Sequence, residues 1–99
     1  MSSTEGFAAD QVSGVFGALG NTTRIKILLL ISETKRPLHI KAVARALKMD
    51  YAAVYRHVQV LQENGLLDAF EVGRSRVLSP KRTELVKQMM EIAKKLGQQ

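Results

Sequence analysis

The sequence contains no cysteine and no tryptophan, and it has only two histidines. Without thiols, the chain can form neither a disulfide nor a thiolate metal site, and it has no cysteine nucleophile. Only His39 and His57 could offer an imidazole to a metal, and a lone histidine is more often a packed or phosphate-binding residue. The sequence therefore predicts no metal and no cofactor.

Long apolar runs and enzymatic motifs are also missing. The longest apolar run, Ile27 to Ile31, is far shorter than the roughly 18 residues of a membrane helix, and the first residues, MSSTEGF, do not resemble an export signal. We expect a cytoplasmic protein with no membrane partner. There are no paired carboxylates at a plausible spacing, no phosphate-binding glycine loop and no nucleophile with an obvious base, so no enzyme is predicted.

Basic residues exceed acidic ones, and the excess is unevenly placed. Residues 35–57 contain six lysines and arginines against one aspartate, and residues 71–82 contain four against one glutamate. Residues 1–34 and 58–70 are slightly acidic. Such a concentration is expected of a protein that neutralises phosphates, although a merely soluble basic face gives the same pattern. A chain of 99 residues has room for one small domain.

Apolar residues recur at helical spacing in several segments of the chain. These segments are separated by residues that favour turns and helix caps. The side chains of Asn21 and Asp50 are expected to cap the helices that follow them, and Gly65 to end a helix with positive φ. Pro37 precedes a short extended segment that could pair with a later hairpin. The predicted elements are helices at 8–19, 22–32, 41–48, 51–64 and 81–96, an extended segment at 38–40, and strands at 66–72 and 77–79 joined by a tip at 73–76.

The second predicted helix is apolar on more than one side. Its expected core-facing side chains are Ile25, Leu28, Leu29 and Ser32, and Ile27, Leu30 and Ile31 are apolar as well. We therefore expect this helix to be the central packing element, covered on more than one side.

The order of these elements predicts a mainly α fold with a small β-hairpin wing. This is a winged helix-turn-helix, in which helices pack on a two- to three-stranded antiparallel sheet. We divide the chain into a flexible tail at 1–8, a DNA-binding domain at 9–80 that includes a dimerisation helix, and a C-terminal dimerisation helix at 81–99.

Apolar residues in the last predicted helix follow one another at intervals of four, three and four, the spacing of a coiled-coil seam. This stripe either folds back on its own core or meets the helix of a partner, and we favour the partner. The first helix would join the same interface. The predicted dimer-interface residues are Val12, Val15, Phe16, Leu85, Met89, Ile92 and Leu96.

The helix predicted at 51–64 has two contrasting faces. Val54, Val58 and Leu61 form an apolar stripe, and the other face could read a major groove. The candidates for base reading are Tyr51, Ala52, Tyr55, Arg56 and Gln59. Arg56 could bind guanine with two hydrogen bonds or clasp a phosphate, and Gln59 could pair with adenine or simply be solvated.

Further basic residues flank this helix in the sequence. The candidates for DNA-backbone contacts are Lys41, Arg45, Lys48 and His57. The candidates in the wing are Arg74, Ser75 and Arg76, whose side chains would enter a minor groove or run beside phosphates.

Over roughly residues 12–96, the chain resembles the ArsR-type winged-helix transcription regulators. FGALGNTTRIKILLLI, at 16–31, is similar to the family's L-g-n/d-p-T-R-l-x-I-L pattern, with Thr22 where proline is usual. KAVARALKMDYAAVYRHVQVLQENGLL, at 41–67, is similar to the family's helix-turn-helix, and VGRSRVLSP resembles a wing. In the second stretch the residues in register with the family are Val54, Arg56, His57, Leu61, Gly65 and Leu66. Tyr55 stands where the family commonly has a small serine.

The resemblance implies a homodimer that places two recognition helices in successive major grooves of operator DNA. It does not imply metal sensing, because KAVARALK replaces the cysteine-rich ligand motif. The favoured function is a sequence-specific, double-stranded DNA-binding transcription regulator, acting as a homodimeric repressor with an unknown effector. The alternatives are a winged-helix protein-interaction module and a nonspecific DNA- or chromatin-binding protein.

Overall fold

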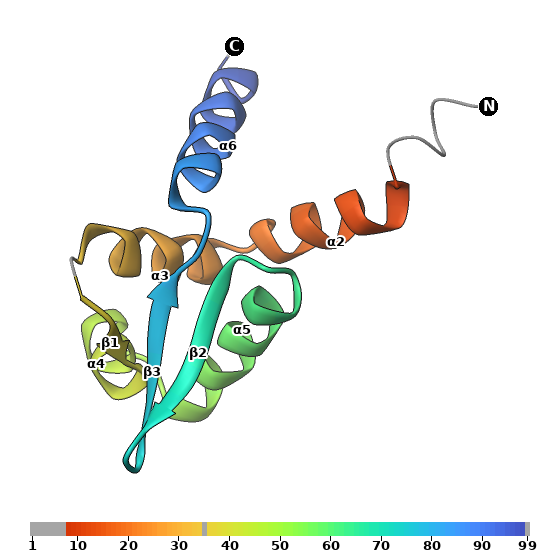
Figure 1. Ribbon diagram of the computed structural model, residues 1–99. Coiled ribbons are helices and arrows are strands. Elements are labelled where there is room, and N and C mark those ends of the chain that lie inside the picture. The colour runs from red at the N-terminus through yellow and green to blue at the C-terminus, as the bar shows by residue number, and fades with distance from the viewer. Residues whose placement is uncertain (1–7, 35, 99) are drawn as a thin grey trace.

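A computed structural model describes residues 8–34 and 36–98 (Figure 1). Over these residues it has five helices and a three-stranded antiparallel sheet, which confirms the predicted winged helix-turn-helix fold. All but one residue of the predicted tail lie outside the described part. The elements are α2 (Ala9–Leu19), α3 (Thr22–Glu33), β1 (Leu38–His39), α4 (Ile40–Leu47), α5 (Tyr51–Glu63), β2 (Leu67–Val72), β3 (Ser75–Pro80) and α6 (Thr83–Leu96).

Local signals account for the ends of several helices. The Asn21 side chain accepts a hydrogen bond from the backbone N–H of Arg24 at 3.1 Å, as predicted for a cap. Asp50 occupies the capping position of α5, but its side chain accepts no capping hydrogen bond, so that part of the prediction was wrong. Gly65 has a φ of +72° and follows the end of α5, as expected. The backbone N–H of Leu66 then bonds to the carbonyl oxygen of Leu61 at 3.0 Å.

The sheet has the strand order β1-β3-β2, so the short extended segment does pair with the hairpin. Leu38 lies opposite Leu78 in β3. The hairpin turn is shorter than predicted, because Val72 pairs with Ser75 and leaves only Gly73 and Arg74 between the strands. Ser75 and Arg76 therefore belong to β3 rather than to the tip.

The start of the last helix also differs from the prediction. Pro80 is the final residue of β3, where it pairs with Leu67, and does not open α6. At this end β3 pairs with β2 alone, and a missing N–H is tolerated in a strand with one open side. The chain then passes through Arg82, with a φ of 55°, before α6 begins.

The hydrophobic core lies between the sheet and helices α3, α4 and α5. Within α3 the buried residues are Ile27, Leu28 and Ile31, whereas Leu29 is 44% exposed, contrary to its predicted position. A helix that is apolar on more than one side gives only a weak amphipathic signal for its inward face. The apolar stripe of α5 packs as predicted. The fully buried large side chains are Ile27, Leu28, Ile31, Ile40, Val43, Val54, Val58, Leu61, Leu67 and Leu78.

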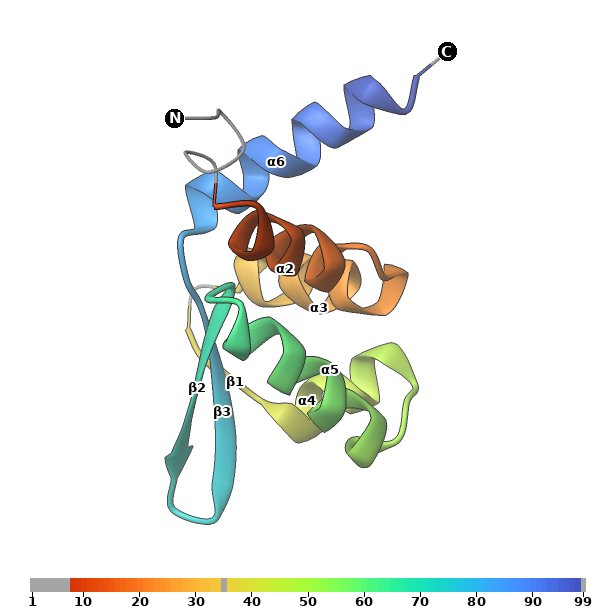
Figure 2. The same cartoon turned by 90° about the vertical axis from the view of Figure 1, so that its right-hand side faces the viewer.

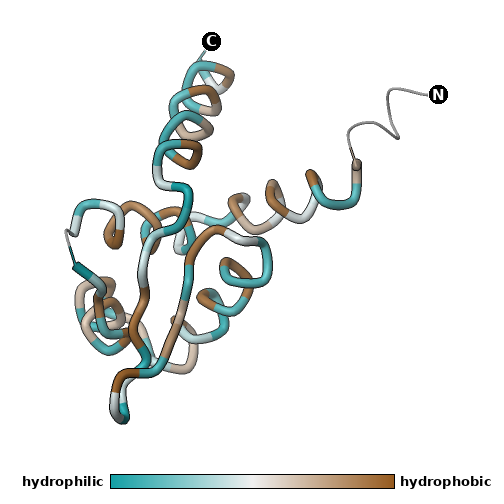
Figure 3. The backbone as a smooth tube through the Cα atoms, viewed as in Figure 1, coloured by the Kyte–Doolittle hydropathy of each residue, from teal (hydrophilic) through white to brown (hydrophobic). Residues whose placement is uncertain are grey.

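The sheet forms one side of the molecule, and helices α3, α4 and α5 lie against one of its faces (Figure 2). The tip of the β2–β3 hairpin points away from α6, which lies over α2 and α3 at the opposite end. Hydrophobic positions continue along the parts of α2 and α6 that extend beyond the rest of the chain (Figure 3). Among the described residues, no single helix is long and apolar enough to cross a membrane; α2 and α3 would suffice only together, and they are bent by 84° at their junction.

Candidate nucleic-acid interface

Helix α5 presents most of the predicted base-reading residues on one exposed face. Because its apolar stripe is buried against the core, the residues on the opposite side of the helix face solvent. Tyr51, Ala52, Arg56 and Gln59 are exposed, and Tyr55 is half-buried. The structure thus brings these five residues together, with Tyr51 at the first position of the helix.

Helix α4 presents a basic face next to α5. Val43 and Ala44 are buried, while Lys41, Arg45 and Lys48 are exposed, because their spacing of four and three places them on one side of the helix. Lys48 ends the helix in a left-handed conformation, with a φ of 56°, and its backbone N–H bonds to carbonyl oxygens of the preceding turn. This turn leads directly into α5.

The two wing arginines occupy different environments. Arg74 is exposed in the two-residue turn. Arg76 lies in β3 with its guanidinium 5.1 Å from the centre of the Tyr55 ring, and its Nη2 atom is 3.5 Å from Oε1 of Glu71. Arg76 is therefore folded onto α5, whereas the sequence predicted both arginines at the tip. The difference arises because the short turn draws Arg76 into the strand ladder.

A small crevice of about 20 Å³ joins the helix-turn-helix to the wing. Its position shows that the start of α4, the start of α5 and the hairpin turn converge at one place. Polar and basic side chains predominate among the residues around it. The crevice is lined by His39, Ile40, Lys41, Tyr51, Arg74, Ser75 and Arg76.

His57 lies at the edge of the core rather than on the outer face of α5. Its Nδ1 atom is 3.3 Å from Nη1 of Arg24. Partial burial of the ring, and then the charges of Arg24 and Arg56, lower the pKa of His57 below its ordinary value of 6.5. A neutral ring is thereby favoured, and the predicted contact of His57 with the DNA backbone stays a prediction.

Arg24 is a residue whose role the sequence did not indicate. Its Nε donates to the carbonyl oxygen of Ala18 at 2.7 Å, and its Nη2 donates to that of Gly17 at 3.3 Å. With the contact to His57, these bonds connect the end of α2 to α5. The sequence signal was the match of Thr23 and Arg24 to the T-R of the family pattern, which carries no information on the contacts of Arg24.

Helices α2 and α6 expose apolar side chains at the end opposite the wing. Phe16 is 61% exposed, Ile92 58% and Leu96 82%, and Val12 and Leu85 are exposed as well. Val15 and Met89 are half-buried. On α6 the predicted stripe therefore stays mostly on the surface. The adjacent positions Val86 and Met90 pack against the core instead.

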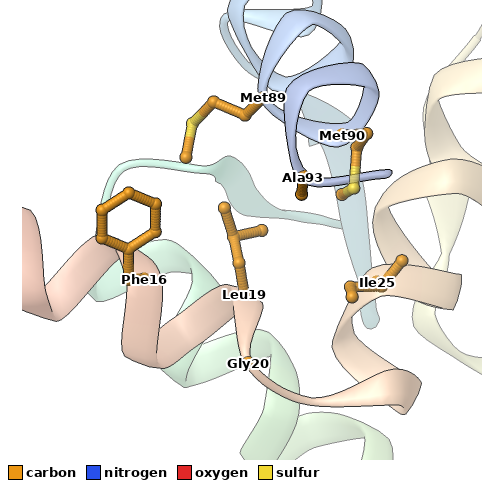
Figure 4. A pocket seen from close by; sticks show the side chains of 7 residues that line it. All are labelled: Phe16, Leu19, Gly20, Ile25, Met89, Met90 and Ala93. Atoms are coloured by element: carbon orange, nitrogen blue, oxygen red, sulfur yellow. The ribbon is translucent and has the colours of Figure 1, made fainter. Parts of the chain in front are cut away.

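A groove of 230 Å³ separates α2 from α6 (Figure 4). The side chains of Phe16 and Leu19 rise from α2 and that of Met89 reaches toward them from α6. The lining is almost wholly apolar and is completed by Gly20, Ile25, Met90 and Ala93. Two predicted interface residues, Phe16 and Met89, thus line one open groove.

Solved structures of other proteins are similar to this chain over most of its length. The homodimeric DNA-binding domain of Mb0332 from Mycobacterium bovis, a possible ArsR-family transcriptional regulator, has a TM-score of 0.81 and 25% identity, covering 95% of this chain and 88% of that one. NolR from Sinorhizobium fredii has a TM-score of 0.76 and 18% identity, covering 100% of this chain and 97% of that one. Reduced HlyU from Vibrio cholerae has a TM-score of 0.74 and 22% identity, with both chains covered completely.

The fold, the basic helix-turn-helix and the wing define a winged helix-turn-helix protein that is similar in structure to ArsR-family proteins, as the sequence resemblance implied. The chain belongs to the HVO_A0114 family, whose model matches residues 21–77, from the cap of α3 into β3. No curated protein matches the sequence.

Proposed function

We propose that this chain is a sequence-specific, double-stranded DNA-binding transcription regulator that works as a homodimer. The observation that carries the proposal is the convergence of the basic face of α4, the exposed face of α5 and the wing turn on one side of the molecule. In helix-turn-helix proteins the second helix enters the major groove, and its N-terminal residues reach base edges. Helix α5 would occupy that position here.

The side chains on and around α5 suit two roles, the reading of base edges and the binding of phosphates. Arg56 can bind guanine or a phosphate, and Gln59 can pair with adenine. Ala52, with its small side chain, allows close approach to the DNA. Lys41 and Arg45 on α4 would bind phosphates, which contribute affinity without sequence information.

Exposed apolar side chains on α2 and α6 support the homodimer. Burying them would remove Phe16, Ile92 and Leu96 from water, and full burial of such a side chain contributes roughly 1.5–3 kcal/mol. The comparable domain of Mb0332 is homodimeric. Two recognition helices related by a twofold axis would bind half-sites about one helical turn apart.

We propose repression as the mode of regulation, because a dimer that occupies promoter DNA blocks access of other proteins to it. The chemistry assigned to the chain is binding alone, without a catalytic step. The proposal includes no effector.

The role of α5 is tested by replacing Arg56 with alanine. Arg56→Ala should weaken binding to the preferred duplex by about 5- to 150-fold, the equivalent of the roughly 1–3 kcal/mol that a good arginine–base contact contributes. Fluorescence anisotropy with a labelled duplex measures the affinity, and circular dichroism checks the fold. The matched control is Lys94→Ala, which removes one positive charge from α6 at the other end of the molecule. Equal affinities of the two variants would refute the assignment of α5 as the recognition helix.

A protein-interaction module is the second candidate, because the apolar face of α6 also suits a different protein. A salt titration separates the two functions. Each phosphate contact contributes about −0.9 to the slope of log affinity against log salt, so a DNA-binding protein with several contacts gives a steep line. A nonspecific DNA-binding protein would bind every duplex sequence with the same affinity.

A further inference from the structure

We propose that Arg76 is a positioning residue of the DNA-reading surface, which holds Tyr55 and Tyr51 in place instead of binding DNA itself. This inference rests on the proposed function of α5 as the recognition helix. It assigns the two wing arginines separate roles: Arg74 contacts DNA, and Arg76 fixes the aromatic side chains that face it.

The strand register places Arg76 on the inner face of the sheet. Side chains alternate along a strand, so Arg76 is on the same face as Leu78, which is fully buried under the helices. Arg76 lies two residues nearer to the hairpin turn than Leu78, where the sheet extends past the core. Glu71 lies directly opposite it in β2 and therefore on the same face.

Arg76 begins a chain of three stacked side chains. Its guanidinium lies 5.1 Å from the centre of the Tyr55 ring, within the range of a cation–π interaction. The Tyr55 ring is in turn stacked on that of Tyr51, with centroids 6.3 Å apart and planes inclined by 24°. Tyr51 is 43% exposed at the N-terminal end of α5, the end that meets base edges. The wing thereby determines the position of a ring on the reading surface.

The charge of Arg76 is already engaged in the free protein. Glu71 pairs with the guanidinium at 3.5 Å, and only 27% of the Arg76 side chain is exposed. A phosphate would have to compete with Glu71 for this guanidinium, whose face already lies against the Tyr55 ring. Arg74 is exposed, and within the described residues no hydrogen bond or ion pair holds its side chain. Arg74 is therefore the wing residue suited to a phosphate contact.

A fixed Tyr51 ring can contribute to sequence preference. Apolar contact with the C5-methyl group distinguishes thymine in the major groove, and an ordered ring provides such contact at a lower entropy cost than a mobile one. Loss of Arg76 should therefore reduce discrimination between duplex sequences as well as affinity.

The composition of the chain makes the stack directly observable. Tyr51 and Tyr55 are the only tyrosines, so NMR signals of tyrosine rings report on this stack alone. In the DNA-free protein, Arg76→Ala should shift the ring signals of both tyrosines. Arg74→Ala, the matched control in the same hairpin, should leave the ring signals of Tyr55 in place, because Arg74 lines the crevice beside Tyr51 and makes no stacking contact with Tyr55.

DNA binding then separates positioning from phosphate contact. The probe is the duplex that the wild-type protein selects from a random pool. Arg76→Ala should bind it about 2- to 30-fold more weakly, which corresponds to a cation–π contribution of roughly 0.5–2 kcal/mol, with an unchanged salt slope. Arg74→Ala should make the salt slope shallower by about 0.9.

Two further variants distinguish the roles if affinity alone does not. Arg76→Lys keeps the positive charge but loses the planar guanidinium that stacks on the ring, so it should restore the tyrosine signals and sequence discrimination only in part. Tyr55→Leu should weaken binding like Arg76→Ala, and combining both changes should add little, because they interrupt the same contact.

A shallower salt slope for Arg76→Ala, with unmoved tyrosine signals and full rescue by Arg76→Lys, would overturn the proposal and make Arg76 a phosphate contact. A wild-type protein that binds no DNA at any salt concentration would instead refute the proposed function, and the role of Arg76 with it.

Discussion

Arg24 and His57 connect parts of the chain that are far apart in the sequence. Arg24 bonds to two carbonyl oxygens at the end of α2, and its guanidinium also lies against the ring of His57 on α5. One side chain on α3 thus holds the proposed dimerisation helix and the proposed recognition helix together. Protonation of His57 would place a second positive charge beside Arg24.

The stability of the fold should depend on the charge of His57. Its pKa is lowered in the folded protein and is about 6.5 in the unfolded chain, so the unfolded chain binds this proton more readily. The stabilisation that neutral His57 gives the folded protein is fully present above about pH 6.5. It is lost as the pH falls from there through the lower pKa of the folded protein. Urea unfolding between pH 8 and pH 5 measures it. His57→Gln should lose less stability over this interval than wild type, and an equal loss in both proteins would contradict the assignment.

Single residues could be predicted from the sequence where the interaction is local. The Asn21 cap involves residues three positions apart and was found as expected. Asp50 has the right residue type at the right position, but the final conformation of its side chain is set by the surrounding structure. The Arg24–His57 contact spans 33 positions and has no local signal. Arg76 was selected correctly as a wing residue, but the register that turns it inward was not predictable.

Helix α2 receives little support from its own fold. Ala18 is the buried residue within it, and its sequence contains two glycines, which lower helix stability. Both facts fit a helix that is completed by a partner.

The two glycines of α2 should respond differently to substitution. Gly17→Ala meets no atom within 4 Å and should stabilise the protein by about 0.5–1 kcal/mol, because alanine favours the helix. The Cβ of Gly14→Ala would lie 2.7 Å from Oδ1 of Asn64, whose amide bonds to the carbonyl oxygen of Val60. The Gly14→Ala control should therefore gain less stability than Gly17→Ala, or should lose stability. Thermal unfolding gives both values, and a lower melting temperature for Gly17→Ala would contradict the open environment of that residue.

The elements themselves were largely predictable, because hydrophobic periodicity determines them. The five helices lie within a few residues of their predicted limits. Errors fall where pairing partners decide the boundary, at the hairpin turn and at Pro80. The inward face of α3 was not fully predictable, since the helix is apolar on more than one side.

The whole molecule is asymmetric in its surface chemistry. Basic residues surround α5 and the wing, whereas exposed apolar side chains gather on α2 and α6 at the other end. Under the proposed function, this separation would let one end assemble two copies while the other end remains free for DNA. The sequence indicated both ends, but the division of the α6 stripe between core and surface depends on how the helix is rotated against α3.

Dimer formation should fail when the exposed part of α6 is made charged. Ile92→Lys with Leu96→Lys should give a folded monomer, because both side chains are exposed in one protomer and neither belongs to its core. The control is Phe70→Lys, which changes an equally apolar exposed residue on the hairpin. Light scattering gives the mass, and circular dichroism verifies the helices. A dimer that survives the double change would move the interface elsewhere.

The most direct test of the central claim is selection of bound duplexes from a random pool, with the mass of the complex measured at the same time. A homodimeric regulator predicts a twofold symmetric site, with half-sites about 34–36 Å apart, bound by two chains. Binding without enrichment of any sequence, or by a single chain, would contradict it.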